Sequence, residues 1–355
     1  MKLWHFLFIP FSGLFLGVVW TKNLLFRMGI LSVKKLRLPV ISIGNLTFGG
    51  TGKTPVIQFL TQFFLKDGIN PLIVCKGYKS QASHPRKVVS PQSPVATELY
   101  GDEPTFLAQR FPTTGVYVGR NTLETCRFAE GDSSGANVLL VDDAFQHRKL
   151  YRDADIVILD CSRPLSEYLP APFGRAREGL SALARADAVF LTKVNLASAS
   201  VLSDIRRSVS ENASERTWVF EFEFNLSHIF CLGEASKRRS LDVLKNERII
   251  LLSGLGNPEA FAGMIRSQAE AEIVHHFIFP DHHTYTLEDI ERGCPFTRNQ
   301  NVGKILVSEK DAVKLKVLMK EEISRFWVTE LELTPRDPEG VQKYLQSLKG
   351  KWRPQ

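Results

Sequence analysis

One glycine-rich segment constrains the fold of this 355-residue chain more than any other: it reads GNLTFGGTGKTP over residues 44–55. An apolar run at 40–43 precedes the segment and predicts a buried strand. The residues that follow it form one apolar helical face, made of Val56, Phe59, Leu60 and Phe63. A strand, a glycine-rich turn and a helix in this order are the context of a P-loop, although Thr47 takes the place of the first glycine in G-x-x-x-x-G-K-T. The segment therefore predicts a phosphate-binding loop.

The residue types of this loop suit a nucleoside triphosphate. Glycines let backbone N–H groups surround phosphate oxygens, and the positive end of the next helix faces the same point. Lys53 can reach the β- and γ-phosphates, and the Thr54 hydroxyl can hold Mg²⁺. We therefore expect ATP and Mg²⁺ to bind here. The expected nucleotide contacts of the loop are Asn45, Phe48, Gly49, Gly50, Thr51, Gly52, Lys53 and Thr54.

A second element supports a nucleotide site. The apolar run 138–141 ends in Asp142 and Asp143, which form the kind of acidic strand end that orients Mg²⁺ in P-loop proteins. Either carboxylate can serve as a metal ligand together with Thr54. The two elements leave a kinase, a GTPase and a partition-type ATPase open, because a fold does not fix a function.

Apolar, β-branched runs recur along the first half of the chain, at 40–43, 71–74, 116–118, 138–141, 156–159 and 188–191. Continuous apolar runs are typical of strands buried on both faces, and the long intervals between these runs leave room for crossover helices. The expected fold class is therefore α/β, with a P-loop NTPase-like parallel sheet as its core.

The pattern changes near Trp218. Residues 218–224 and 326–333 alternate apolar and polar side chains, which predicts two paired, half-exposed antiparallel strands. Between them, runs at 249–252 and 305–307 predict a second, smaller α/β domain, joined by a two-stranded linker that can act as a hinge. The expected parts are a membrane-associating helix and basic apron (1–37), the P-loop core (38–217), the linker (218–230 and 325–334), the smaller domain (231–324) and a C-terminal segment (335–355).

Composition indicates an ordinary folded protein with a negatively charged partner. A hydrophobic content of 44% and a charged content of 23% exclude wholesale disorder. The formal net charge of +7 favours phosphate ligands, nucleic acid or an acidic membrane surface. The sequence has no recognisable nucleic-acid-binding module, so no nucleic-acid partner is expected. The 5 cysteines form no C-x-x-C pair, which predicts reduced thiols in the cytosol.

The N-terminal segment suggests contact with a membrane. Residues 3–20 carry no formal charge, and a helix of this length would extend about 27 Å, which is marginal for crossing a bilayer. The basic residues that follow suit an anionic cytoplasmic leaflet: Lys22, Arg27, Lys34, Lys35 and Arg37. We expect an anchor that is embedded in the membrane or lies along it. A buried docking helix and a cleaved signal peptide are the alternatives.

Further polar clusters stand outside the loop. Residues 101–104, GDEP, place Asp102 and Glu103 ahead of a helix, where an N-cap role is also open. The tandem His282 and His283 after Asp281 can be structural, metal-binding or catalytic. Residues 146–149, QHRK, extend the acidic strand end with a hydrogen-bonding, cationic tail that suits an anionic substrate.

Eight short segments of the chain, taken in their order, match the motifs of one known family. They are ISIGNLTFGGTGKTP (41–55), KGY (76–78), GDEP (101–104), DDAFQHRKLYRDADIVILD (142–160), PFGRARE (172–178), GLGNPEAF (254–261), FPDHHTY (279–285) and SEKDAVKL (308–315). In these segments, and in their order over almost the whole chain, the sequence resembles the tetraacyldisaccharide 4'-kinases, the lipid A 4'-kinase family.

The resemblance implies transfer of the γ-phosphate of ATP to the 4'-hydroxyl of a tetraacylated glucosamine disaccharide 1-phosphate, forming the lipid A precursor lipid IVA. It implies that Asp102 accepts the hydroxyl proton with His282 or His283 as its partner, and that Lys53 and Mg²⁺ neutralise developing charge. It also implies a lipid substrate, a place on the cytoplasmic face of the bacterial inner membrane through the N-terminal segment, and no obligate protein partner. The further expected contacts are Arg177 and Glu178 for the nucleotide, and Tyr78, Glu103, Arg120 and Gln146 for the substrate.

Two other classes of function stand as alternatives. A nucleotide-switch ATPase or GTPase would bind protein partners, and the run 192–195, TKVN, resembles a guanine-reading Lys-x-Asp motif with Asn195 in place of the Asp. A metal phosphoesterase would use Asp281, His282 and His283, but the sequence lacks the other aspartate clusters that such a site needs. Dependence of ATP consumption on an acylated disaccharide acceptor separates the kinase from the nucleotide switch.

Overall fold

The structure, a computed structural model, describes residues 17–18, 21–77, 84–93, 95–133, 135–170, 173–234, 236–290, 302–318 and 323–350. Within these residues, 12 strands form one sheet in the order β10-β9-β11-β12-β8-β7-β6-β1-β5-β2-β4-β3. The strands are β1 (Val40–Asn45), β2 (Pro71–Lys76), β3 (Arg86–Lys87), β4 (Val116–Gly119), β5 (Val138–Asp142), β6 (Ala154–Asp160), β7 (Ala188–Thr192), β8 (Trp218–Cys231), β9 (Arg248–Ser253), β10 (Glu272–Ile278), β11 (Lys304–Ser308) and β12 (Phe326–Pro335).

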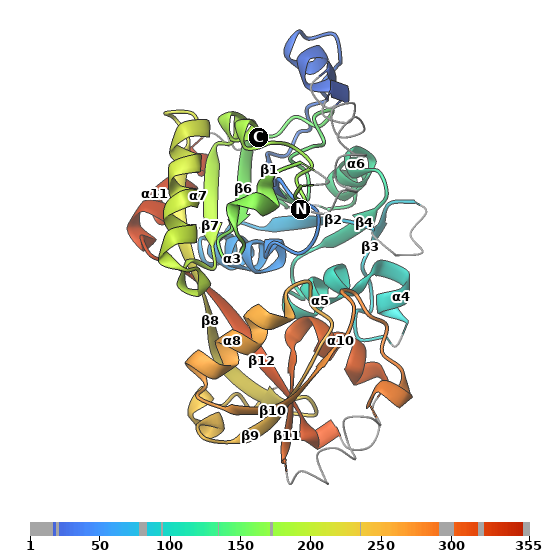
Figure 1. The fold of residues 1–355 in the computed structure, drawn as a ribbon. Coiled ribbons are helices and arrows are strands. Elements are labelled where there is room, and N and C mark those ends of the chain that lie inside the picture. Colours follow the sequence, from blue (N-terminus) through green and yellow to red (C-terminus); the bar gives the residue numbers. More distant parts are fainter. Residues whose placement is uncertain are drawn as a thin grey trace.

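Helices cover this sheet and fill its crossover connections (Figure 1). The α-helices are α3 (Lys53–Lys66), α4 (Ala96–Tyr100), α5 (Asp102–Arg110), α6 (Thr122–Asp132), α7 (Ala199–Asn212), α8 (Pro258–Gln268), α10 (Glu309–Leu318) and α11 (Pro338–Lys349). The short 3-10 helices are η1 (Leu165–Tyr168), η2 (Leu180–Arg185), η3 (Val194–Leu196), η4 (Leu241–Leu244) and η5 (Ile323–Arg325).

The parallel core matches the expected α/β class. Each of the six predicted apolar runs is a strand, and β1, β5, β6 and β7 are buried at every residue. Strand β1 pairs in parallel with β5 on one side and with β6 on the other, which puts the phosphate loop at the centre of the sheet. Burial on both faces explains why these strands read as continuous apolar runs.

The predicted buried face of helix α3 is confirmed at Val56 and Leu60 but not at Phe59 and Phe63. Its buried apolar side chains are Val56, Ile57, Leu60 and Phe64. Phe59 and Phe63 are only partly buried, because they lie at the edge of the interface with the sheet. Phe59 still packs edge-on against Phe222 of β8, with ring centroids 5.4 Å apart. The helix therefore contacts both the core strands and the strand that leaves the core.

Strands β8 and β12 reverse the direction of the sheet. The start of β8 pairs in parallel with β7, and the remainder of β8 pairs with β12 in the predicted antiparallel arrangement. Strand β12 then pairs in parallel with β11, which pairs with β9. In Figure 1 these two strands run between the larger lobe, which contains α3, and the smaller lobe, which contains α8 and α10. The carboxyl ends of the parallel strands of the two lobes consequently face each other.

The predicted alternation is found in β8 from Phe220 onward, whereas Trp218 and Val219 are both exposed, and it is partial in β12. In β8, Phe220, Phe222 and Phe224 are buried, and the glutamates between them are partly exposed. Residues 326–330 of β12 are all buried, because this half of the strand lies inside the smaller lobe between β8 and β11. Glu330 is tolerated there because Arg238 forms two hydrogen bonds of 2.6 and 2.8 Å with its carboxylate.

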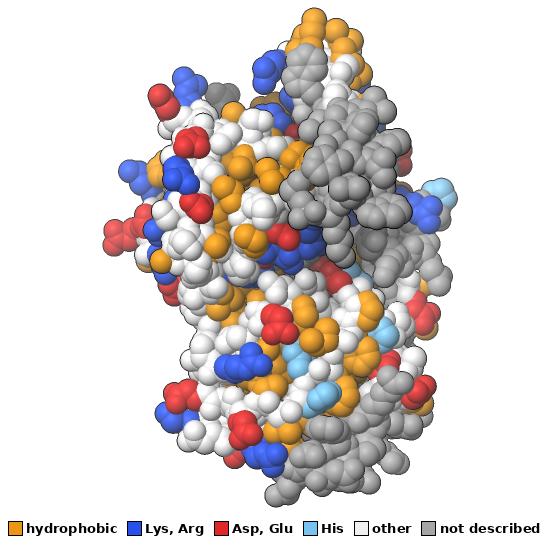
Figure 2. Space-filling view, viewed as in Figure 1, with side chains coloured by type: hydrophobic (Ala, Val, Ile, Leu, Met, Phe, Trp, Pro, Cys, Tyr) orange, Lys and Arg blue, Asp and Glu red, His pale blue; other side chains and the backbone are white. Residues whose placement is uncertain are grey.

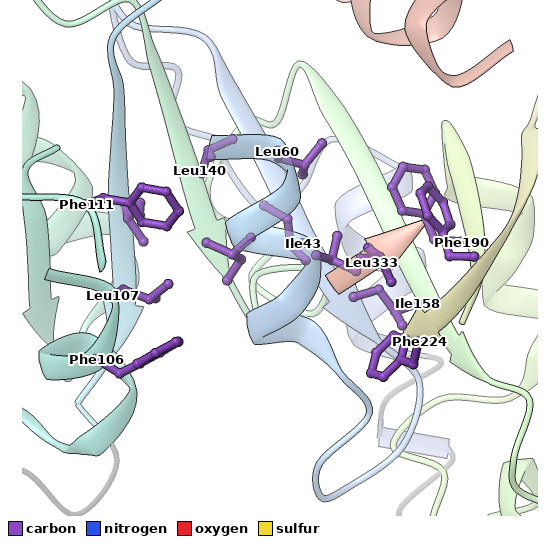
Figure 3. Close-up of a cluster of buried hydrophobic side chains, with 14 of the residues drawn as sticks. Ile43, Leu60, Phe106, Leu107, Phe111, Leu140, Ile158, Phe190, Phe224 and Leu333 are labelled. Atoms are coloured by element: carbon purple, nitrogen blue, oxygen red, sulfur yellow. The ribbon is translucent and has the colours of Figure 1, made fainter. Parts of the chain in front are cut away.

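One hydrophobic cluster extends across both lobes. It joins Ile43 of β1 and Leu60 of α3 to Phe224 of β8, Leu333 of β12 and Phe261 of α8. Figure 3 shows part of this cluster, including the labelled side chains of α3, α5 and the central strands. Separate clusters fill the remaining faces of the two lobes. The connection between the lobes is therefore packed, and does not consist of hydrogen-bonded strands alone.

The predicted N-terminal segment at 3–20 lies outside the described residues, apart from Gly17 and Val18. After it, residues 21–27 are helical, and Met28, Ile30 and Val33 expose 46% or more of their surface. Hydrophobic side chains accordingly gather at the top of the view in Figure 2. Among the described residues, none of the helices combines the length and the apolar character needed to cross a membrane.

We predict that Phe222→Ala destabilises the protein by about 3–5 kcal/mol, because it removes a fully buried ring from between Phe59 and Phe190. Urea unfolding followed by tryptophan fluorescence measures the change. Val219→Ala, at an exposed position of the same strand, is the matched control and should change stability by less than about 1 kcal/mol. Equal effects of the two substitutions would contradict the packing described for β8.

Candidate active site

The loop between β1 and α3 has the conformation of a phosphate-binding loop. Gly49 and Gly52 have φ angles of +95° and +86°, which glycine adopts without strain. A methyl group on Gly52 would lie 2.8 Å from Cζ of Phe224, so a side chain at this position would clash. No side chain of the described residues caps α3 at Gly52, which leaves the first N–H groups of the helix without a side-chain acceptor at the cap. Such N–H groups bind phosphate oxygens.

Arg177 connects the acidic strand end to this loop. Its guanidinium donates to both carboxylate oxygens of Asp143, at 2.9 and 2.7 Å, and to the carbonyl of Thr47 at 3.2 Å. It also donates to Oδ1 of Asn45 and lies over the ring of Phe48, 5.4 Å from the centroid. The structure thus brings together three of the predicted nucleotide contacts, Asn45, Phe48 and Arg177.

Asp142 and Asp143 have different surroundings. Asp143 faces Arg177 and Lys53, whose Nζ is 3.6 Å from Oδ1; although burial opposes them, these groups hold the pKa of Asp143 well below its usual range. Burial raises the pKa of Asp142 against the attraction of Lys53, and among the described residues its Oδ1 has no hydrogen-bond partner. A buried, unpaired carboxylate oxygen suits a metal ion. Asp142 therefore fits Mg²⁺ better than Asp143 does.

A cavity lies between the loop and the smaller lobe. Gly50, Gly52 and Thr54 line it from the loop, and its other lining residues include Glu103, Asp281 and Lys310. The loop after β9 approaches closely, since a methyl group on Gly256 would lie 3.0 Å from Oδ2 of Asp281 and 3.5 Å from the backbone nitrogen of Gly50. Figure 2 shows basic and acidic side chains gathered at the waist between the lobes.

Asp102 and His282 form a hydrogen-bonded pair that bridges the two lobes. Asp102 is the first residue of α5, and His282 lies in the loop after β10. Nδ1 of His282 is 3.0 Å from both carboxylate oxygens of Asp102. His282 has a φ of +59°, and Asp143 and Lys193 have similar left-handed values. Such conformations are uncommon outside glycine and tend to occur at functional sites.

His283, the other histidine of the tandem, points elsewhere. Its Nε2 is 2.9 Å from Oδ2 of Asp289, and its ring stacks on Phe279 with centroids 4.6 Å apart. The structure therefore separates two residues that the sequence leaves equivalent, and pairs only His282 with Asp102. In the part of the chain that the structure describes, no group of three or more His, Cys, Asp or Glu side chains is arranged to hold a metal ion.

Two lysines that sequence reasoning missed surround the same carboxylate. Lys310 Nζ is 3.8 Å and Lys314 Nζ is 3.6 Å from Oδ2 of Asp102. Burial tends to raise the pKa of Asp102, but the His282 hydrogen bond and the two ammonium groups hold it well below its usual range. The lysines stand four residues apart in α10, so they share one helical face. The four-residue spacing of the two lysines was the sequence feature that could have indicated a shared helical face. Nothing in the sequence, however, indicates which carboxylate the lysines contact.

The remaining predicted residues lie at varied distances from the loop. Gln146 is close, because its Nε2 donates to the carbonyl of Asn45 at 3.0 Å. Glu178 is buried and pairs with Arg185 at 2.9 Å, an arrangement that indicates a structural contact. Arg120 is exposed just after β4. Glu103 lines the cavity, Thr51 is buried beside Asn45, and Tyr78 lies outside the described residues.

The run 192–195 does not present its asparagine to a nucleotide base. Asn195 donates through Nδ2 to the carbonyl of Phe224 at 2.9 Å, and its Oδ1 accepts from the N–H of the same residue at 3.0 Å. Lys193 forms an ion pair with the buried Asp160 and lines the cavity. The asparagine thus has a structural role in holding β8.

The sequence as a whole matches one family. A family model described as tetraacyldisaccharide-1-P 4'-kinase matches residues 4–349. The tetraacyldisaccharide 4'-kinase of Bdellovibrio bacteriovorus is 36% identical over 333 residues, which cover 93% of this chain and 95% of the relative. That of Methylobacillus flagellatus is 32% identical over 320 residues, which cover 90% of this chain and 85% of the relative.

A solved structure has the same architecture. It is LpxK from Aquifex aeolicus in complex with ATP, which is 26% identical and superposes with a TM-score of 0.75. The match covers 98% of this chain and 99% of that one. It shows that the α/β class expected from the sequence is correct. Both the sequence and the architecture establish that this chain belongs to the tetraacyldisaccharide-1-P 4'-kinase family.

Proposed function

We propose that this chain transfers the γ-phosphate of ATP to the 4'-hydroxyl of a tetraacylated glucosamine disaccharide 1-phosphate, producing the bis-phosphorylated precursor of lipid A. One observation carries the proposal beyond family membership. Glu103 and Asp281, the neighbours of the Asp102–His282 pair, line the same cavity as the phosphate loop. A proton acceptor and a triphosphate site can therefore serve one reaction.

The chemistry follows from the poor nucleophilicity of a sugar hydroxyl. In the transfer, the hydroxyl oxygen forms a bond to the γ-phosphorus, the bond between that phosphorus and ADP breaks, and the hydroxyl proton passes to Asp102. His282 holds the acceptor carboxylate through both of its oxygens. Incubation with ATP labelled at the γ-phosphate and the disaccharide 1-phosphate lipid tests the proposal, and the label should be found at the 4' position.

The contacts described above indicate which residues would bind the nucleotide. The N–H groups of the loop would bind the phosphates, and Lys53 would leave Asp143 to contact them. Mg²⁺ would be held by Thr54 and Asp142, and when bound it supplies positive charge to the β- and γ-phosphates. Through its contacts with Asp143 and Asn45, Arg177 would hold the acidic strand end and the loop in fixed positions relative to each other.

We further propose that the two lobes close during the reaction. The phosphate loop belongs to the larger lobe and His282 to the smaller one, and β8 and β12 are the strands that run between them. Closure on these strands as a hinge would exclude water from the cavity and limit idle ATP hydrolysis. The domain division expected from the sequence, with its linker at 218–230 and 325–334, corresponds to this motion.

Membrane association through the N-terminal part is also a proposal. The substrate is acylated, and the described residues beyond position 20 expose Met28, Ile30 and Val33 beside Lys34 and Lys35. Apolar side chains next to basic ones suit an anionic bilayer surface. We place the protein on the cytoplasmic face of the inner membrane, where ATP and the lipid are both accessible.

Substitutions at the pair should separate the two histidines. Asp102→Asn is expected to lower kcat by about 10²- to 10⁴-fold with ATP affinity nearly unchanged, because it removes only the proton acceptor. His282→Gln should lower kcat by at least about 10-fold, whereas His283→Gln should have a smaller effect, because His283 faces Asp289. Steady-state kinetics with nucleotide-binding measurements decide this. Wild-type turnover by Asp102→Asn would refute the base assignment.

Removal of the metal ligand should act on nucleotide binding. Asp142→Ala is expected to abolish most of the gain in ATP affinity that Mg²⁺ provides, whereas the ATP affinity measured in EDTA should change little. The substitution should also remove most of the turnover. Titration calorimetry with and without Mg²⁺ measures both affinities. Asp204→Ala, at an exposed position of α7, is the control. An undiminished Mg²⁺ effect in Asp142→Ala would assign the metal to other residues.

Deletion of residues 1–20 should lower activity on lipid presented in vesicles far more than it lowers ATP affinity, because only the acceptor is in the membrane. The same protein assayed on a detergent-dispersed lipid of the same headgroup should recover much of its rate. Equal losses in vesicles, in detergent and in ATP binding would instead indicate a docking role for the segment.

A further inference from the structure

Arg175 lies against the phosphate loop, and the mechanism above does not use it. Its guanidinium fills the space beside Gly49, where a methyl group would overlap Nη2 and lie 3.1 Å from Cζ. Gly49 has a φ of +95°, so a glycine is suited to this position by its backbone conformation as well as by the room it leaves. The guanidinium therefore packs directly on the backbone of the loop.

Backbone contacts tie the segment that carries Arg175 to the same loop. The carbonyl of Arg175 accepts a hydrogen bond from the N–H of Phe48 at 2.8 Å. The next residue, Ala176, forms an antiparallel bridge with Thr47. On its other side, the N–H of Arg175 donates to the carbonyl of Glu167 at 2.8 Å. Because both backbone groups of Arg175 are bonded, its side chain starts from a fixed point beside the loop.

The guanidinium itself is only loosely held. Its Nη1 is 3.7 Å from Oε2 of Glu167, which is longer than a hydrogen bond, and that same oxygen is 3.4 Å from Nη1 of Arg163. The side chain of Arg175 is 40% exposed, and an exposed ion pair of this kind contributes little to stability. Arg177, in contrast, is bound by both carboxylate oxygens of Asp143. Arg175 is therefore free to move to a stronger anion.

The neighbouring Gly50 faces the side of the loop where the acceptor is expected. A methyl group on Gly50 would lie 4.0 Å from Oδ2 of Asp281, and Gly50 lines the cavity. Asp281 precedes His282, whose ring contacts the carboxylate of Asp102. For an in-line transfer the γ-phosphate must lie between the loop and the acceptor hydroxyl. Arg175 thus packs on the part of the loop that is next to the expected γ-phosphate.

We propose that Arg175 is a further catalytic residue of the transfer: when ATP is bound, its guanidinium leaves Glu167, contacts the γ-phosphate and stabilises the charge that develops on the transferred group. A guanidinium suits this task because it donates two parallel hydrogen bonds to phosphate oxygens. In P-loop proteins such an arginine accelerates phosphoryl transfer by about 10³- to 10⁵-fold. The inference rests on the proposed function, and it adds one cation to Lys53 and Mg²⁺.

Kinetics of Arg175 variants test this role. Arg175→Met keeps an apolar stem beside Gly49 and should lower kcat for lipid phosphorylation by at least about 10²-fold, because the cation is lost. Arg175→Lys should recover only part of the rate, since an ammonium keeps the charge but lacks the planar fork of donors. Arg207→Met, at an exposed position of α7, is the matched control and should keep the wild-type kcat.

A binding measurement tests the contact without any lipid. Aluminium fluoride added to ADP and Mg²⁺ mimics the transferred phosphoryl group, and the wild-type protein should bind ADP more tightly in its presence. Arg175→Met should lose at least about 10-fold of this gain, while its affinity for ADP alone stays at the wild-type value. Titration calorimetry measures both affinities. An equal loss of affinity for ADP with and without aluminium fluoride would show that Arg175 only supports the loop.

A purely structural role for Arg175 predicts a different pattern. If Arg175 served only to hold Glu167, then Glu167→Gln would lower kcat as much as Arg175→Met does, and the inference would be wrong. We expect Glu167→Gln to lose far less, because the arginine leaves this carboxylate when ATP is bound. Urea unfolding establishes that each variant is folded, and Arg175→Gln takes the place of Arg175→Met if the latter is not.

The outcomes also separate this inference from the proposed function. If the wild-type protein transfers no phosphate to the lipid, the proposed function fails, while the measurement with aluminium fluoride still tests Arg175. If transfer occurs and Arg175→Met retains both the wild-type kcat and the full gain in ADP affinity, the inference alone fails.

Discussion

The antiparallel pairing of β8 with β12 is the constraint on which the rest of the structure depends. Parallel strands bind ligands at their carboxyl ends, so a single parallel sheet offers one such edge. Here one reversal of direction turns the carboxyl ends of β9 and β11 toward those of β1 and β5. The phosphate loop and the loop that carries His282 consequently face each other, although neither sequence nor sheet order places them together.

Burial of several charges in a small volume is the main energetic demand of this site. An isolated buried carboxylate costs several kcal/mol, and such groups persist only when they are paired or bound to metal. Asp102 meets this demand with His282, Lys310 and Lys314, and Asp143 meets it with Arg177 and Lys53. Among the three aspartates, Asp142 differs because its buried Oδ1 has no hydrogen-bond partner in the described residues. That carboxylate is therefore the one that suits a metal ion.

The sequence predicts local features of this protein well and its long-range contacts poorly. The loop at 44–55, the acidic strand end and the core strands are found as predicted, because each depends on a short run and its flanks. The choice between His282 and His283 depends on a backbone turn with positive φ, which adjacent identical residues cannot reveal. Lys310 reaches Asp102 only through the folded sheet, and the burial of Glu330 depends on its two neighbouring strands. Pattern alone cannot supply such contacts, because they join segments far apart in the chain.

Phe224 shows how the loop, the core and the smaller lobe are physically linked. Its carbonyl accepts from Asn195 of the larger lobe at 2.9 Å and from Gln268 of α8 at 3.0 Å, which uses both lone pairs of the oxygen. Its ring lies where a side chain on Gly52 would be. The parallel pairing of β8 with β7 ends two residues earlier, at Phe222. Strand β8 is therefore held by both lobes at the point where it leaves the core, and the phosphate loop packs on that same residue. The loop and the strand that connects the lobes therefore share one packing contact.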